Sequence, residues 1–295
     1  GNPVARGVSA FGMMPMPRCL RPLSVTAALA AAFLAVGSAF AGSGLVTVEA
    51  LDSLPRADIA ILGEVHDNPE HHVNQARAVS ALVPRALVWE MLTPEQAARM
   101  PDEREDAEAV ADAIGWETSG WPDFALYHPV LMAAPGAQIY GGGVPRATAR
   151  RVFDEDSAAV FADLFGAQAD PLGLDKPLAP GDQAAREAAQ AEAHCDALPV
   201  HLLPGMVAAQ RLRDAALAHV ALQALADTGG PVVVIAGTGH ARNDIGIPAF
   251  LRRSDQQPGV LSLGQMEAAP DAPAPYDLWI VTEPAPRPDP CEGLR

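Results

Sequence analysis

Two Gly-x-x-His tetrads are the residues of this chain whose types and spacing are best suited to chemistry. The first is Gly63-Glu64-Val65-His66, after the apolar run Ile59–Leu62, and the second is Gly237-Thr238-Gly239-His240, after Val232–Ile235. Short apolar runs that end at glycine are typical of strands covered on both faces of a parallel sheet. Ligands of such sheets bind outside the carboxyl ends of the strands. The two histidines are therefore expected to meet at one edge of a sheet.

Carboxylates accompany these histidines. Glu64 belongs to the first tetrad, and Glu90 directly follows another apolar run. A buried carboxylate is costly unless it is paired or ligated, so Glu90 is expected to partner His66, His240 or a bound cation. A capping role or a plain ion pair is the alternative for Glu90. Imidazole and carboxylate groups at one edge are suited to a metal site or to proton transfer.

Arginines form a second group of candidates. Pro145 is expected to open a helix with Arg146, Arg150 and Arg151 in its first turns. Backbone N–H groups at a helix start, beside an arginine, favour an anion site. Ion pairing with surface acids is the alternative for Arg150 and Arg151. Beyond the second tetrad, Arg242 places a fixed cation beside His240.

An aromatic segment offers a third kind of group. Residues 120–129 contain Trp121, Phe124, Tyr127 and His128. Such clusters are usually core or the wall of a pocket. The segment also supplies the phenolate and imidazole ligands that a haem iron accepts. Both interpretations stay open at this point.

Six apolar runs are predicted to form the strands that position these groups. They are Ile59–Glu64, Ala86–Met91, Ala137–Gly142, Val232–Gly237, Val260–Gln265 and Leu278–Thr282. Helical patterns separate most of them, which predicts βαβ units. The expected fold is α/β, with a mainly parallel sheet flanked by helices. No strand signal occurs over about 154–203, so this stretch is expected to be a helical insertion, a smaller helical subdomain beside the sheet.

The helix after the first tetrad has a clear start. Asn68 before Pro69 predicts a capped first turn, and the pattern runs to about Leu82 with Val73, Ala76 and Val79 facing inward. His71 and His72 in its first turns are interpreted either as site residues or as helix surface. Further helices are expected over 102–113, 184–193 and 206–226.

The first 41 residues have the order of a secretory signal peptide. Arg18 and Arg21 precede the apolar core Leu23–Val36, and Ala39-Phe40-Ala41 is a cleavage site. Residues 1–41 are therefore expected to be upstream sequence and signal peptide, with cleavage near Ala41. Residues 42–295 would form the domain, located in the periplasm or secreted, with no integral membrane segment after processing.

The net charge bears on the partners of the protein, and the cysteine content bears on disulfide formation. The chain has 20 Lys and Arg against 36 Asp and Glu, a formal net charge of −16. Such acidity argues against nucleic acid as a partner. Two cysteines, Cys195 and Cys291, remain after processing. In an exported protein an even count favours a disulfide between them, and free thiols at a metal site are the alternative.

Four motifs in order resemble the ChaN-like haem-binding uptake proteins of the Tiki/TraB superfamily. They are G-E-V-H-D-N-P-E-H-H from 63, W-P-D-F-A-L-Y-H-P from 121, V-P-R-A-T-A-R-R-V from 144 and G-T-G-H-A-R-N-D-I-G-I-P from 237. The resemblance spans about 57–251. It implies an exported protein that holds haem through a tyrosine at a homodimer interface and serves haem or iron uptake, with a haem receptor or transporter as a further partner.

The resemblance also implies roles for particular side chains. Tyr127, or alternatively Tyr140, would ligate the haem iron, and His66 and His240 would line the pocket. Arg146 and Arg242 would pair with the haem propionates. The chain departs from the family pattern at Val65, at Gly142-Gly143 and at Thr238, where amide side chains are usual.

A metal-dependent hydrolase is the competing interpretation. In it, His66, His240, Glu64 and Glu90 would hold a divalent ion that activates water. Two considerations favour haem: the resemblance is closest there, and the sequence contains no H-E-x-x-H zinc-protease motif.

Overall fold

The computed structural model describes residues 44–289, 291 and 292, so the predicted signal peptide lies outside the described residues. Each of the six predicted strands is present. They are β1 (Ile59–Glu64), β2 (Ala86–Trp89), β3 (Gln138–Gly141), β4 (Val232–Gly237), β5 (Val260–Met266) and β6 (Leu278–Val281). The helices are α1 (Pro69–Leu82), α2 (Pro94–Ala97), α3 (Ala107–Ile114), α4 (Phe124–Met132), α5 (Arg146–Arg150), α6 (Ser157–Phe165), α7 (Pro180–Ala193), α8 (Leu203–Thr228) and α9 (Ile247–Leu251).

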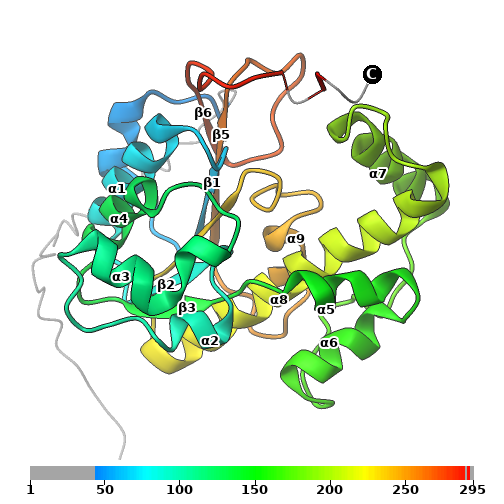
Figure 1. Cartoon of the computed structure of the whole chain (residues 1–295), viewed down its shortest axis with the longest axis horizontal. Coiled ribbons are helices and arrows are strands. Elements are labelled where there is room, and N and C mark those ends of the chain that lie inside the picture. The colour runs from blue at the N-terminus through cyan, green and yellow to red at the C-terminus, as the bar shows by residue number, and fades with distance from the viewer. Residues whose placement is uncertain (1–43, 290, 293–295) are drawn as a thin grey trace, which may run out of the picture. The chain divides into compact units, whose positions relative to one another are not determined.

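The strands form one sheet in the order β3-β2-β4-β1-β5-β6. Every pairing in it is parallel, which confirms the predicted fold class. Figure 1 shows α1, α3 and α4 on one side of the sheet, with α8 and α9 on the other. The two tetrad strands, β1 and β4, are direct neighbours at the centre, with Glu64 opposite Gly237.

Alternate residues of the central strands supply two separate cores. Leu62, Trp89 and Ile235 pack with α1, α3 and α4, whereas Ile61 and Val234 pack with α8. This alternation follows from the two-residue period of a strand, because both faces of the sheet are covered by helices. The carboxyl ends of β1, β2 and β4 are therefore held rigidly from both sides.

The helix α1 begins as predicted, but its buried face is only partly the predicted one. The Asn68 side chain accepts a hydrogen bond from the Glu70 N–H, and Pro69 occupies the first turn. Val73, expected inside, is 63% exposed. Val79 is buried and Ala76 packs against the core, as predicted, and the buried face also carries His71, His72, Asn74, Gln75 and Ala78. The expectation for Val73 failed because this helix packs a largely polar face against the strand ends, where those side chains find hydrogen-bond partners.

Other helix boundaries depend on caps and prolines. The acidic stretch predicted from Asp102 becomes helical only at Ala107, because the Asp106 side chain accepts hydrogen bonds from Glu108 and Ala109. The helix predicted from Ala184 begins earlier, at Pro180, and α8 extends over 26 residues. Between β3 and β4 the described chain contains helices and no strand.

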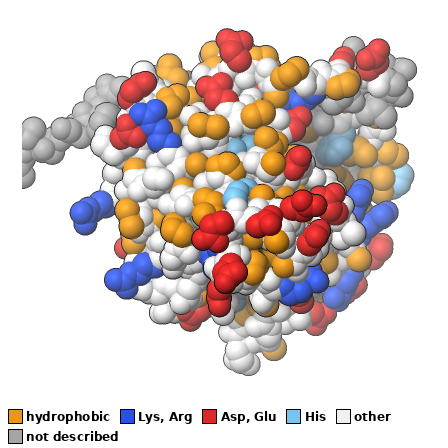
Figure 2. Space-filling view, turned by 60° about the vertical axis from the view of Figure 1, so that its left-hand side comes forward, with side chains coloured by type: hydrophobic (Ala, Val, Ile, Leu, Met, Phe, Trp, Pro, Cys, Tyr) orange, Lys and Arg blue, Asp and Glu red, His pale blue; other side chains and the backbone are white. Residues whose placement is uncertain are grey.

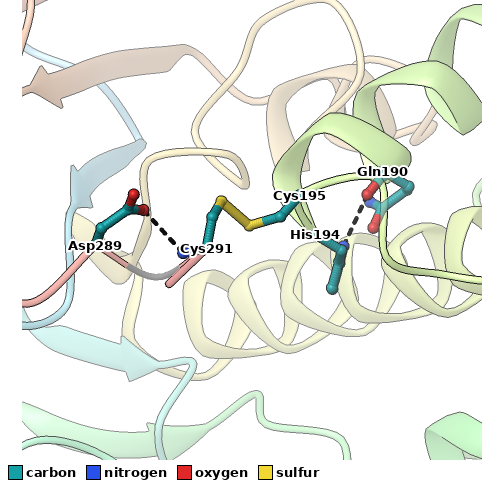
Figure 3. The surroundings of a disulfide bond; sticks show 5 residues. All are labelled: Gln190, His194, Cys195, Asp289 and Cys291. Carbon is teal, nitrogen blue, oxygen red and sulfur yellow. Dashed lines mark hydrogen bonds between the residues drawn. A yellow bond between two sulfur atoms is a disulfide. The ribbon is translucent and has the colours of Figure 1, made fainter. Parts of the chain in front are cut away.

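A disulfide joins Cys195, just after α7, to Cys291 in the C-terminal segment (Figure 3). The predicted pairing is confirmed, with the two Cα atoms 5.6 Å apart. Acidic side chains are spread over the face drawn in Figure 2, among apolar ones. Among the described residues, no helix combines the length and the apolar character needed to span a membrane.

The glycines after β3 allow two backbone segments to approach closely, which leads to a first prediction. A Cβ atom on Gly143 would lie 2.5 Å from the Glu90 carbonyl oxygen and 2.8 Å from that of Leu92. Gly143→Ala should therefore lower the free energy of unfolding by about 1–3 kcal/mol, as measured by urea denaturation. Gly136→Ala is the matched control, because a Cβ atom there meets nothing within 4 Å. Equal stability of the two variants would contradict the prediction.

Candidate functional site

The pairing of β1, β4 and β2 brings both tetrads and Glu90 to one edge of the sheet. Glu64 ends β1 opposite Gly237 of β4. Glu90 follows β2, and its N–H donates to the Ile235 carbonyl of β4. The Glu90 Oε2 atom accepts a 2.7 Å hydrogen bond from the Gly237 N–H. Backbone pairing therefore fixes the positions of both carboxylates.

Five side chains at this edge form an alternating chain of carboxylates and imidazoles. Glu64 Oε1 lies 2.7 Å from His66 Nδ1, and His66 Nε2 lies 3.9 Å from Glu90 Oε2. Glu90 Oε1 lies 3.2 Å from His240 Nε2, and His240 Nδ1 lies 2.6 Å from Asp214 Oδ1. The structure thus brings together the four predicted residues and adds Asp214 from α8. We call these five residues the imidazole–carboxylate chain.

His66 is the most accessible member of the imidazole–carboxylate chain, and the residues at its two ends, Glu64 and Asp214, are buried. The side chain of His66 is 31% exposed and packs on the Trp121 ring at 4.7 Å between centroids. The side chains of Glu64, His240 and Asp214 are almost entirely buried. Within the imidazole–carboxylate chain, His66 therefore has the most solvent-exposed side chain.

The charges within the chain stabilise one another. Burial alone would lower the pKa of His240, but Glu90 and Asp214 raise it to about 10. Burial would likewise raise the pKa of Glu90, yet His240 and His66 lower it to about 2. The pKa of His66 is also raised, because the hydrogen bond to Glu64 and the charge of Glu90 outweigh burial. The Glu90 carboxylate thus favours the imidazolium form of His240, whereas burial outweighs the pairing with His240 at Asp214 and raises the pKa of that carboxyl.

His71 and His72, interpreted from the sequence as site or surface residues, are not on the surface, and His72 Nδ1 lies 3.5 Å from Glu64 Oε2 of the site. Both are fully buried. His71 Nδ1 accepts from the Val65 N–H at 2.8 Å, and its Nε2 lies 2.8 Å from Thr282 Oγ1. His72 Nε2 lies 2.8 Å from the carbonyl oxygen of His66. Their role is to hold the loop that carries His66.

The two tyrosines implied as iron ligands lie in different places, and the hydroxyl of Tyr127 lies at this edge, 3.4 Å from the His66 carbonyl oxygen. Tyr127 is 0% exposed and packs between His72, Trp89 and Trp116. Its burial, reinforced by the charge of Glu64, raises its pKa far above the ordinary value, which disfavours the phenolate. The inward face of α4 thus completes the core, and iron ligation by Tyr127 stays a prediction.

Tyr140 is placed elsewhere. Its hydroxyl lies 2.9 Å from Gln138 Oε1 and 3.1 Å from Asp227 Oδ2, which comes from the last turn of α8. That turn precedes β4, so it lies at the amino-terminal edge of the sheet, opposite the tetrads. The third tyrosine, Tyr276, is half-buried and donates to the Thr238 carbonyl.

A cleft of about 600 Å³ opens beside the imidazole–carboxylate chain. Glu90, His240 and Trp121 line it, together with Arg146 and Arg213. A second cavity of about 700 Å³ adjoins the cleft and shares those two arginines. We refer to them as the cleft and the adjoining cavity. Arg146 is thus at the site, as predicted from the resemblance.

Arg242, unlike Arg146, already binds an acidic side chain. Its guanidinium forms two hydrogen bonds with the Asp244 carboxylate, at 3.0 and 2.7 Å. It lines a separate pocket with Arg186, on the far side of Gln210. Arg242 therefore already has a carboxylate partner at the surface, and its pairing with a propionate stays a prediction. Arg151 is similarly paired, with Glu155 and Asp163 at the surface.

The residues named for a divalent ion lie together, but they bind one another. Both nitrogens of His240 face carboxylate oxygens, and His66 Nδ1 faces Glu64. Within the described part of the chain, no group of three or more His, Cys, Asp and Glu side chains is arranged to hold a metal ion.

Sequence reasoning missed Asp214, Gln210 and Arg213, all on α8. Gln210 Nε2 lies 3.2 Å from His240 Nδ1, and Asp214 makes the closest contact of that imidazole. The signal was the spacing: residues four apart share a helix face, so an amide and a carboxylate at 210 and 214 point the same way.

The imidazolium of His240 leads to a pH prediction. Its pKa is raised from 6.5 to about 10 in the folded state, so its contribution to stability is full below pH 6.5. That contribution is lost as the pH rises from 6.5 toward about 10. The free energy of unfolding should therefore fall more steeply over this range in the wild type than in His240→Gln, as measured by urea denaturation. Parallel declines in both proteins would contradict the assignment.

A family model described as haem-binding uptake, Tiki superfamily, ChaN, matches residues 50–251. The sequence has no significant match among curated proteins. Among solved structures, one describing cofacial haem binding to ChaN of Campylobacter jejuni superposes with a TM-score of 0.59 at 18% identity. That match covers 79% of this chain and 88% of the Campylobacter chain.

Two other solved structures are less similar. The type III effector HopBA1 has a TM-score of 0.40 at 15% identity, covering 80% of this chain and 91% of its own. The erythromycin esterase EreC in its open conformation has a TM-score of 0.41 at 13% identity, covering 75% of each chain. The family match extends over more than half of the chain and includes both tetrads, so the chain belongs to the ChaN-like haem-binding uptake family of the Tiki superfamily.

Proposed function

We propose that this protein binds haem at the cleft and the adjoining cavity and serves haem or iron uptake. Family membership and the description of Campylobacter ChaN as a binder of cofacial haem support this function. Bound haem would supply a redox-active iron and a flat apolar ring. The protein would supply the walls, the propionate partners and the surroundings of the iron.

The observation that carries the proposal is the pair of arginines shared by the two cavities. Arg146 and Arg213 line both of them, and neither has an ion-pair partner among the described residues. Unpaired guanidinium groups are unexpected in a chain with a net charge of −16. They fit an anionic ligand, because arginine pairs well with carboxylates.

The walls fit the rest of the haem group. Met91, Trp121, Val144 and Leu217 give the cleft apolar surface, and the adjoining cavity is more apolar still. Both volumes lie within the range of ordinary ligand pockets, about 300–1,000 Å³. Apolar walls with arginines between them match an apolar ring with two carboxylates.

The imidazole–carboxylate chain has a supporting role in this proposal. His66 Nδ1 is bound by Glu64, and Glu90 lies near its Nε2, so the ring is oriented by acids rather than left open for iron. Its exposed edge can donate a hydrogen bond to a ligand beside Trp121. His240, enclosed by Glu90 and Asp214, acts as a fixed positive charge in the wall.

The arginines provide the test. Arg146→Ala and Arg213→Ala should each weaken haemin binding about tenfold, since a charge-assisted hydrogen bond contributes roughly 1.5–3 kcal/mol. Haemin titration followed at the Soret band measures this change. Arg151→Ala is the control, because that side chain is paired with Glu155 and Asp163 at the surface. The function would be rejected if wild-type protein bound haemin no better than an unrelated acidic protein does.

Export and delivery belong to the same proposal. Residues 16–41 act as a signal peptide, and the mature protein in the periplasm or outside the cell transfers haem to a receptor or transporter. A homodimer is the proposed haem-binding form. The basic start, apolar core and A-x-A site predict Gly42 as the mature N-terminus. N-terminal sequencing of protein from a periplasmic extract tests this, and a product that retains Arg18 would contradict export by cleavage.

A further inference from the structure

A pocket of about 540 Å³ lies between α7, α8 and the loop that begins with the second tetrad. We call it the α7–α8 pocket. Gln210 is the one lining residue that it shares with the cleft, and it shares none with the adjoining cavity. The pocket is therefore a space of its own, next to the proposed haem site.

The interface between two packed helices usually consists of apolar side chains, but at this pocket it is polar. α7 packs along α8 (Figure 1), yet none of the described side chains of α7 is fully buried. Asp182, Arg186 and Gln190 are four residues apart on α7, so they share one helix face, and that face lines the pocket. Gln210 and Asp214 line it from α8 with the same spacing. The two helices thus enclose charged and amide groups.

Two of the three acids that line the pocket already have partners. Asp214 Oδ1 lies 2.6 Å from His240 Nδ1, and the Asp244 carboxylate accepts two hydrogen bonds from Arg242. The third acid, Asp182, is exposed to solvent. The buried acids of the pocket are therefore not free to bind a further cation.

Arg186 is the cation of the pocket whose charge is not paired. Its Nε atom is buried and has no hydrogen-bond partner. No acid in the described part of the chain lies within ion-pair distance of it, and this includes Asp182 one turn earlier. Burial lowers the pKa of Arg186, and the acids of the pocket offset this effect only in part. Because a guanidinium stays charged and a buried donor without a partner is costly, an anion is the partner that this side chain needs.

Two further arginines add positive charge near Arg186. Arg211 donates a 2.9 Å hydrogen bond to the Lys176 carbonyl oxygen, and the Arg253 guanidinium lies over the Phe250 ring, 5.1 Å from its centroid. Neither has an ion-pair partner among the residues that the structure describes. Burial, and then the charges of Arg186 and Arg253, lower the pKa of Arg211, so these cations repel one another. An anion bound at Arg186 would relieve that repulsion.

The other walls of the pocket favour an organic acid over an inorganic ion. Val207 and Ile245 provide apolar surface for a carbon skeleton, and the amides of Gln190 and Gln210 provide hydrogen bonds. The volume lies within the range of ordinary ligand pockets, about 300–1,000 Å³. A carboxylate fits the forked edge of a guanidinium with two parallel hydrogen bonds. The acids that line the pocket disfavour an ion with several charges, such as phosphate.

We propose that the α7–α8 pocket binds a small organic acid, whose carboxylate pairs with the guanidinium of Arg186. This site goes beyond haem binding, because its lining is separate from the proposed haem site except at Gln210. A haem propionate presents the same carboxylate chemistry, so the experiment must separate the two sources.

The experiment is isothermal titration calorimetry on the full mature chain without haem, with lactate, succinate and glutamate as probes. At least one of them should bind with one site per chain, and Arg186→Gln should weaken its binding at least about tenfold. Inorganic phosphate should bind more weakly than that probe. Arg77→Gln is the matched control and should keep the wild-type affinity, because it removes the same charge from α1, where Arg77 is paired with Asp52.

A second variant tests the pocket without changing any charge. Ala185 is exposed on α7 and lines the pocket, so Ala185→Phe should fill part of the space and weaken binding of the same probe about tenfold or more. Ala188 is equally exposed on the same helix but is not part of the lining. Ala188→Phe should therefore bind the probe as the wild type does.

Haemin titration of the same variants separates the two carboxylate sources. Arg186→Gln should keep haemin affinity within about twofold of the wild type, and haemin-loaded protein should still bind the probe. Competition between probe and haemin, with both weakened in Arg186→Gln, would assign Arg186 to a propionate and overturn the proposal. Absence of binding by all three carboxylates, wild-type affinity in Arg186→Gln, or tighter binding of phosphate would also overturn it. If haemin does not bind at all, the proposed haem function fails, whereas the result with the carboxylates stands separately.

Discussion

The parallel pairing of β1 with β4 is the constraint on which the site depends. Its register places Glu64 opposite Gly237, so two tetrads more than 170 residues apart begin side by side. The pairing of β2 with β4 then adds Glu90 to the same edge. A shift of one residue in either pairing would send alternate side chains to the other face of the sheet. Such a shift is prevented because helices cover both faces of the sheet, and each of the two cores needs particular apolar residues of these strands.

Placing five ionisable side chains at that edge, four of them buried, requires that each one meets an opposite partner. The alternation of acid and imidazole satisfies this requirement, since both His66 and His240 lie beside two carboxylates. An uncompensated buried charge would cost several kcal/mol. The same requirement explains the polar inner face of α1, because Gln75 donates to the Leu62 carbonyl and His72 contacts that of His66. The inner face of α1 thus makes hydrogen bonds where a helix usually packs apolar side chains, and these bonds fix the loop that carries His66.

The positions of the strands and of the start of α1 could be predicted from the sequence, but the orientations of several side chains could not. Apolar runs ending at glycine located all six strands, and Asn68-Pro69 located the start of α1. The polar part of the inner face of α1 could not be predicted, because helical patterning assumes an apolar core. Tyr127 belongs to a motif of the family, yet a motif does not say whether a ring faces a pocket or the core. Asp214 escaped notice because its burial depends on β4, which is distant in sequence.

The helix α8 shows how one element can serve two sites of opposite charge. Successive residues of a helix project about 100° apart, so Asp214 turns to His240 while Arg213 turns to the cleft and the adjoining cavity. The acid stabilises a buried imidazolium, and the guanidinium remains available to a ligand. With a net charge of −16, the chain as a whole repels an anion such as haemin. Attraction must therefore come from nearby arginines, at distances within about 10 Å where salt screens little. Clustering of Arg146, Arg150 and Arg213 around one apolar cavity meets that requirement, whereas the same arginines dispersed over the surface would not.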